Sequence, residues 1–157
     1  MNNTEKLAER GSKVIMNTYS RFPIAFDHGE GMYVWDMDGK KYLDFVAGIA
    51  VNSLGYSNPK LGKKIAEQSM KLIHVSNLYY TEPQIELAEM LRENSCFDKV
   101  FFCNSGAETI ESALKIARKY AAMKGKSGRT IITMEKSFHG RTYGAVTATG
   151  QDKYHKG

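Results

Sequence analysis

Three stretches of the chain carry apolar residues at the spacing of an amphipathic helix, three or four positions apart. They cover about residues 58–73, 81–93 and 105–125. The first begins with Asn58 at a favourable N-cap position and Pro59 at the first helical position, where a missing N–H is tolerated. The pattern therefore predicts three amphipathic helices.

Residue pairs typical of a capping box mark the start of two of these helices. Thr81 is followed by Gln84, and Ser105 by Glu108, at the required spacing. We expect the hydroxyl of the first residue in each pair to accept a backbone N–H from the helix. Gly125 is predicted to end the third helix, because glycine readily adopts the left-handed conformation found after helix C-termini.

The N-terminal part of the chain has shorter elements. Residues 1–16 are predicted to form a helix or an arm, and residues 21–26 an extended segment. Two short strands at 33–36 and 41–45 flank the dipeptide Asp38-Gly39, which is a strong signal for a hairpin turn.

Apolar segments on both sides of the third helix predict two buried strands, at residues 99–103 and 129–134. A strand, a helix and a strand in this order form a βαβ unit, in which the two strands are parallel. The sequence therefore predicts an α/β fold with a mainly parallel sheet flanked by helices. Residues 142–150 are rich in small side chains and fit either a tightly packed helix or a strand.

Composition narrows the classes of function. The 157 residues are 42% hydrophobic and 25% charged, as in a globular domain, with a net charge of +5. The basic residues are scattered, so we expect a mild preference for anionic ligands and no nucleic-acid partner. The polar start of the chain and the absence of a long apolar run favour a cytoplasmic protein with no membrane partner. Cys96 and Cys103 form no metal-type pair, and no metal site is expected.

The turn Ser105-Gly106-Ala107 carries the first candidate chemistry. Free N–H groups at a helix N-terminus, together with the helix dipole, favour an anion such as phosphate. Gly106 allows the backbone to approach that anion closely, and Ala107 adds little bulk. The pattern is neither a Walker loop nor a dinucleotide fingerprint. A well-capped helix without a ligand is the alternative interpretation.

The second candidate is Phe138-His139-Gly140-Arg141, which follows the second predicted strand. Both turns are therefore expected at the carboxyl ends of parallel strands, where ligands bind. Phe138 can stack on a planar ring, and Arg141 can bind a carboxylate through two parallel hydrogen bonds. These groups together suit a pyridine-type cofactor and an amino acid. A phenylalanine in the core and an arginine on the surface are the alternatives.

Several motifs in the same order resemble those of the class III aminotransferases, a family of pyridoxal-phosphate enzymes. These motifs lie in the segments 29–45, 102–108 and 137–142. Two further runs, 48–55 and 76–79, are most similar to family members that act on N-acetylornithine. The resemblance extends from about Tyr19 to Gly157 and covers somewhat less than half of such an enzyme.

The resemblance implies the front part of the fold type I architecture, which usually forms a homodimer. Residues 1–55 would be the N-terminal arm and hairpin of the small domain, and residues 56–157 the first part of the large cofactor-binding domain.

The resemblance also implies roles for individual residues. Ser105, Gly106 and Ala107 would hold the phosphate of pyridoxal 5′-phosphate, and Phe138 would stack on its pyridine ring. On the substrate side, Arg141 would bind the α-carboxylate of the amino donor and Tyr19 would line the substrate pocket.

The implied reaction transfers the distal amino group of N-acetylornithine to 2-oxoglutarate, a step of arginine biosynthesis. The lysine that forms the Schiff base with the cofactor is expected beyond Gly157, so we assign no catalytic residue here and expect this chain alone to be inactive. Class III aminotransferases that act on ornithine, succinylornithine or 4-aminobutyrate are alternatives. A non-catalytic phosphate-binding module is an alternative from a different class.

Overall fold

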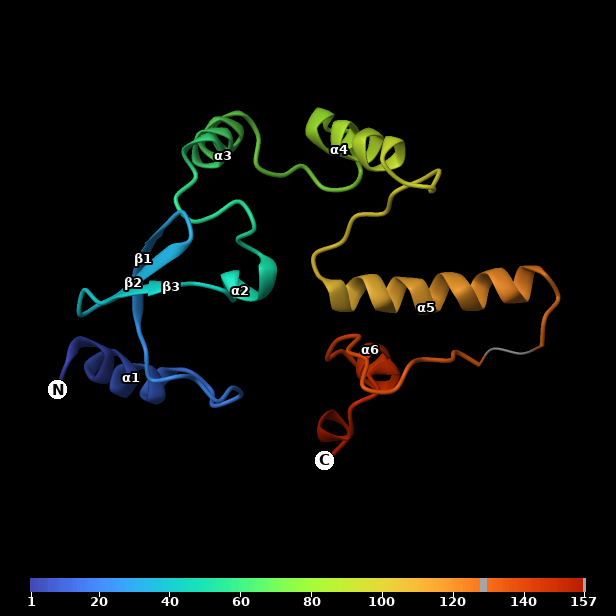
Figure 1. Cartoon of the computed structure of the whole chain (residues 1–157). Coiled ribbons are helices and arrows are strands. Elements are labelled where there is room, and N and C mark those ends of the chain that lie inside the picture. The colour runs from blue at the N-terminus through green and yellow to red at the C-terminus, as the bar shows by residue number, and fades with distance from the viewer. Residues whose placement is uncertain (128–129, 157) are drawn as a thin grey trace. The chain divides into compact units, whose positions relative to one another are not determined.

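The computed structural model describes residues 1–127 and 130–156. These residues form two compact units, Met1–Tyr79 and Tyr80–Gly157 (Figure 1). The predicted division into a small domain up to residue 55 and a large domain from residue 56 stays a prediction. We describe each unit by itself.

The first unit begins with helix α1 (Asn3–Val14) and continues with a three-stranded antiparallel sheet. The strands are β1 (Phe26–Glu30), β2 (Tyr33–Asp36) and β3 (Lys41–Leu43), in this spatial order. The predicted helix near the N-terminus and the predicted β2–β3 hairpin are confirmed. Strand β1 is an addition, because its run Phe-Asp-His-Gly-Glu has little strand propensity and forms a strand only by pairing with β2.

A single carboxylate organises the β2–β3 turn. Asp36 Oδ1 accepts the N–H groups of Asp38 at 3.0 Å and Lys40 at 2.9 Å, and Asp36 Oδ2 accepts the Tyr42 hydroxyl at 2.7 Å. The Tyr42 hydroxyl, followed by the Lys40 N–H, lowers the pKa of this carboxyl below its ordinary value. Gly39 completes the turn at a φ of +83°, as the sequence predicts.

Two more helical segments follow in the first unit. Helix α2 (Ala47–Ala50) is a short kinked turn, and α3 (Pro59–Lys71) is the first predicted amphipathic helix. The Asn58 side chain caps α3, because its Oδ1 accepts the N–H groups of Lys60 at 3.0 Å and Leu61 at 3.2 Å. The sequence therefore predicts this helix and its cap correctly.

The second unit contains the other two predicted helices, α4 (Glu82–Glu93) and α5 (Gly106–Met123). It ends with α6 (Tyr143–Ala148) and the 3₁₀ turn η1 (Asp152–Tyr154), so the small-residue segment is helical. Thr81 is the N-cap residue of α4 as predicted, but the predicted capping box is wrong, because the Thr81 side chain accepts no N–H from the helix. The predicted positive φ of Gly125 after α5 is confirmed at +65°.

The strands predicted at residues 99–103 and 129–134 are absent from the described part of the chain, and residue 129 lies outside it. The only sheet among the described residues is antiparallel, so the expected parallel pairing is not formed between these residues. A strand exists only where its N–H and C=O groups pair with a neighbouring backbone, and neither segment has such a neighbour among the described residues.

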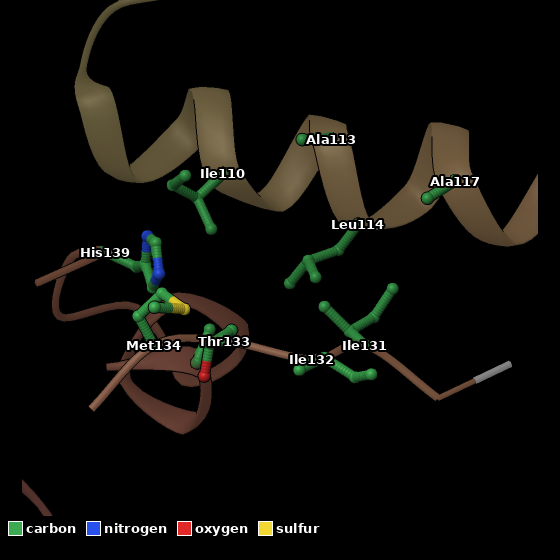
Figure 2. Close-up of a pocket in the computed structure, with 10 residues that line it drawn as sticks. Ile110, Ala113, Leu114, Ala117, Ile131, Ile132, Thr133, Met134 and His139 are labelled. Atoms are coloured by element: carbon green, nitrogen blue, oxygen red, sulfur yellow. The ribbon is translucent and has the colours of Figure 1, made fainter. Parts of the chain in front are cut away.

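Residues 131–134 nevertheless lie along the apolar face of α5. Figure 2 shows the side chains of Ile131 and Ile132 on the same side of the helix as Leu114, in a pocket of about 340 Å³. The predicted amphipathic pattern of α5 is therefore confirmed, and the segment predicted as the following strand lies against its apolar face. The prediction is wrong about the hydrogen bonding of that segment.

Few side chains are buried among the described residues. The buried apolar ones are Val34 and Ala145, and the buried polar ones are Asp36 and Thr149. Each unit therefore contributes one buried apolar and one buried polar residue to this set, Val34 and Asp36 in the first and Ala145 and Thr149 in the second. No described helix is both long and apolar enough to cross a bilayer.

Gly39 and Gly62 form a matched pair for testing the hairpin turn. Neither has an atom within 4 Å of the position that a Cβ would take, but Gly39 has a φ of +83° whereas Gly62 lies inside α3. We expect Gly39→Ala to lower the free energy of unfolding by about 1–2 kcal/mol through backbone strain. Gly62→Ala should raise it by about 0.5–1 kcal/mol. Urea denaturation followed by circular dichroism measures both, and effects of the same sign would contradict the left-handed turn.

Candidate functional site

The N-terminus of α5 presents unused backbone donors. Ser105 is the N-cap, and its Oγ accepts the Glu108 N–H at 3.2 Å. Gly106 and Ala107 are the first two helical residues, so no preceding turn of the helix accepts their N–H groups. A Cβ on Gly106 would have no atom within 4 Å, which shows that the space beside this backbone is open.

The predicted capping box at this position forms only in part. The Glu108 carboxylate accepts the N–H of Asn104 at 2.7 Å, one residue before the cap. The two hydrogen bonds still fix the turn that leads into α5. They leave the first two N–H groups of the helix directed at the same space.

The loop with Phe138 and Arg141 packs directly on this helix turn. Gly140 has a φ of +131° and is buried. A Cβ at residue 140 would lie 2.8 Å from the Cβ of Ala107 and 3.0 Å from that of Ala145. Only glycine therefore fits between α5 and α6 at this point.

A buried hydroxyl holds the same loop from the other side. Thr149, which is 1% exposed, accepts the His139 N–H at 2.9 Å through its Oγ1. Its own proton is directed to the carbonyl oxygens of Ala145 at 3.0 Å and Gly140 at 3.3 Å. The His139 N–H and the Gly140 carbonyl of the loop are thus hydrogen-bonded inside the protein, as buried polar groups must be.

Glu111 links α5 to the start of α6. Its Oε1 accepts the Thr142 hydroxyl and the N–H groups of Gly144 and Ala145. The Thr142 hydroxyl is the largest cause that lowers the pKa of the Glu111 carboxyl, and burial opposes it. The carboxylate is therefore stabilised in its charged form at neutral pH.

These elements enclose a pocket of about 820 Å³. It is lined by all five residues that the sequence assigns to cofactor and carboxylate binding in this unit: Ser105, Gly106, Ala107, Phe138 and Arg141. No lysine is among the described residues that line it. The two loops thus open onto one cavity.

The side chain of Phe138 is 52% exposed, and its ring lies 5.6 Å from that of Tyr154 at an angle of 57°. One face of an aromatic side chain is therefore available at the pocket. Tyr19 belongs to the first unit, and its predicted role at a substrate pocket stays a prediction.

Hydroxyl and backbone N–H donors at a helix N-terminus fit a phosphate group, and the open space beside Gly106 leaves room for it. The described residues contain no cluster of three or more histidine, cysteine or acidic side chains that could hold a metal ion.

Sequence reasoning missed the residues that bring these loops together. Glu111 and Thr149 carry no local motif, since their hydrogen bonds reach residues far along the chain or in another element. Two signals could have found Glu111. It stands one helical turn after Ala107, on the same face of α5, and a second glycine follows Arg141 at position 144.

Comparison with known families identifies the class of protein. The family model for class III aminotransferases matches residues 14–157, and the chain belongs to this family. Members of the family are pyridoxal-phosphate-dependent enzymes of fold type I.

Two relatives of high sequence identity are acetylornithine aminotransferases. The chain is 61% identical over 146 residues to the acetylornithine aminotransferase of Caldanaerobacter subterraneus subsp. tengcongensis and 57% identical over 141 residues to that of Clostridium acetobutylicum. These matches cover 92% and 89% of this chain but only 37% and 36% of the two relatives. The chain therefore spans little more than a third of their length.

Solved structures agree with this assignment. The structure of ornithine aminotransferase from Toxoplasma gondii matches with a TM-score of 0.90 at 26% identity. The match covers 99% of this chain and 38% of that enzyme chain. Acetylornithine aminotransferase from Elizabethkingia anophelis matches with a TM-score of 0.76 at 33% identity, over 92% of this chain and 37% of that enzyme chain.

Gly140 and Gly106 allow the contact between the two loops to be tested. Gly140→Ala places a methyl group against Ala107 at a strained φ, so we expect it to lower the free energy of unfolding by about 1–3 kcal/mol. Gly106→Ala adds the same methyl group to the same pocket, but in open space, and should change stability by less than about 0.5 kcal/mol. Thermal denaturation of both variants measures the difference. A stable Gly140→Ala variant would show that the loop does not pack on α5.

Proposed function

We propose that this chain is the N-terminal part of an acetylornithine-type aminotransferase, which transfers the distal amino group of N-acetylornithine to 2-oxoglutarate. The proposal places the enzyme in arginine biosynthesis. One observation carries it: the anion-binding turn at Ser105 and the Phe138–Arg141 loop line a single pocket. The high identity to acetylornithine aminotransferases supports the choice of substrate.

In this proposal the N-terminus of α5 holds the cofactor phosphate. The N–H groups of Gly106 and Ala107 and the Ser105 hydroxyl donate to the phosphate oxygens, and the helix dipole adds favourable electrostatics. Phe138 packs against the pyridine ring. When bound, pyridoxal phosphate supplies an electron sink for removal of a proton from the carbon that bears the amine.

Arg141 receives the α-carboxylate of the amino donor. A guanidinium presents two parallel N–H donors that match a carboxylate, so it fixes the orientation of the substrate as well as its charge. Binding at that end directs the distal amine of N-acetylornithine toward the cofactor. Tyr19 completes the proposal as a residue of the substrate pocket.

The lysine that binds the cofactor covalently is proposed to lie outside this chain. No lysine lines the pocket in the described part of the protein, and the relatives are more than twice as long as this chain. Residues that complete the site would then come from the rest of the parent enzyme, which is the longer aminotransferase that contains this chain. We further propose that the parent is a homodimer and works in the reducing cytoplasm, where the exposed thiols of Cys96 and Cys103 would stay free.

The proposal is tested by comparing the parent enzyme with the 157-residue chain. We expect the parent to transaminate N-acetylornithine with 2-oxoglutarate at a higher kcat/KM than free ornithine. The short chain should be inactive, and borohydride reduction in the presence of pyridoxal phosphate should give no stoichiometric adduct at one lysine.

If the parent enzyme prefers free ornithine, the proposed substrate is wrong and ornithine takes its place, as in the ornithine aminotransferase of Toxoplasma gondii. A stoichiometric adduct on the short chain, or an inactive parent, would refute the proposal in its present form.

Arg141→Lys in the parent enzyme keeps the charge but loses the planar pair of donors. We expect KM for N-acetylornithine to rise on the order of 10-fold or more, with a smaller change in kcat, because the lost hydrogen bonds act mainly in binding. The exposed Arg92 in α4 offers a matched control, and Arg92→Lys should leave both constants unchanged. An unchanged KM in the Arg141→Lys variant would remove this residue from the substrate site.

A further inference from the structure

One carboxylate oxygen of Glu111 accepts three hydrogen bonds. The Thr142 hydroxyl donates to Oε1 at 2.6 Å, the Gly144 N–H at 2.9 Å and the Ala145 N–H at 3.2 Å. Glu111 stands in the second turn of α5, more than 30 residues before these donors. These hydrogen bonds connect α5, the helix that begins at the Ser105 turn, with the first turn of α6.

The close approach of this carboxylate requires a glycine. A Cβ at residue 144 would lie 2.9 Å from both Cδ and Oε1 of Glu111. The contact therefore depends on the absence of a side chain at this position. Gly140, four residues earlier, lacks room for a side chain as well.

The two contacts are made by the residues on either side of Arg141 in the sequence. Gly140, the residue before it, is seated against Ala107, and Thr142, the residue after it, donates to Glu111. Ala107 and Glu111 are four residues apart and so lie on the same face of α5. The backbone on either side of Arg141 is thus fixed to two successive turns of one helix.

From this geometry we infer that Glu111 is a positioning residue for carboxylate recognition: it holds the backbone of Arg141 so that the guanidinium meets the α-carboxylate of the amino donor. The inference rests on the proposed function, because it assigns Arg141 to that carboxylate. Glu111 touches neither the substrate nor the cofactor in this role. It acts through Thr142 and the first turn of α6.

A positioning role makes a selective prediction. Loss of Glu111 should weaken the recognition of a donor that has an α-carboxylate and should spare a donor that lacks one. N-acetylornithine and N-acetylputrescine form such a pair, because they differ only by this carboxylate. A purely structural role would lower kcat/KM for both donors by the same factor.

The experiment uses the parent enzyme and the variants Glu111→Ala and Glu111→Gln. We expect Glu111→Ala to reduce the ratio of kcat/KM for N-acetylornithine over N-acetylputrescine on the order of 10-fold, mainly through KM. Glu111→Gln retains a carbonyl oxygen for the three donors and should restore the ratio to within about three-fold of wild type. The exposed Glu89 in α4 provides the matched control, and Glu89→Ala should leave the ratio unchanged.

Direct binding gives a second readout. N-acetylnorvaline carries the carboxylate and the acetyl group of the donor but no distal amine, so it binds without reacting. We expect its Kd, measured by calorimetry, to rise on the order of 10-fold in Glu111→Ala and to recover in Glu111→Gln. Where Glu111→Ala does not fold, Thr142→Val tests the same tie, since it removes only the hydroxyl donor, and should shift the donor ratio in the same direction.

The outcomes separate the two proposals. A wild-type parent that does not use N-acetylornithine refutes the proposed function. An active wild type in which Glu111→Ala or Thr142→Val lowers kcat/KM equally for both donors, or for neither, refutes the positioning role of Glu111 alone.

Discussion

The candidate site depends on the contact between Gly140 and Ala107. Two backbone segments approach so closely there that a methyl group on residue 140 would lie 2.8 Å from the Ala107 Cβ. Because closely packed atoms leave no room for sliding, this contact gives the loop one position along α5. Phe138 and Arg141 lie within two residues of Gly140, so the contact also determines where the ring and the guanidinium stand relative to the first N–H groups of the helix.

The elements that the sequence predicts correctly are those whose deciding interactions are local. Asn58 caps α3 through N–H groups two and three residues away, and Gly39 closes the hairpin between two adjacent strands. The segments 99–103 and 130–134 failed as strands, because a strand is defined by a hydrogen-bonding neighbour that a local pattern does not contain. Strand β1 shows the converse, since pairing with β2 overrides a polar sequence.

The sequence predicts that the turn at Ser105 and the loop at Phe138 lie close together, and they do, but for a different physical reason. The sequence places Ser105 and Phe138 together because both should follow parallel strands, and the pocket does contain both residues. The described structure joins them instead through Gly140 and through the tie from Glu111 to Thr142. Such contacts between distant residues leave no periodicity in the sequence, which is why chemistry could be assigned to the two loops but their attachment could not.

The hydrogen bond from the Glu108 N–H to Ser105 Oγ has a consequence for selectivity. It occupies one lone pair of the oxygen and leaves the hydroxyl hydrogen available for a ligand beside the first backbone N–H groups. The first two N–H groups of the helix and this hydroxyl can all donate to an oxyanion at this place, whereas backbone N–H groups offer a cation no lone pair. In the proposed site, the preference for a phosphate over a cation would therefore come first from the backbone at the start of α5.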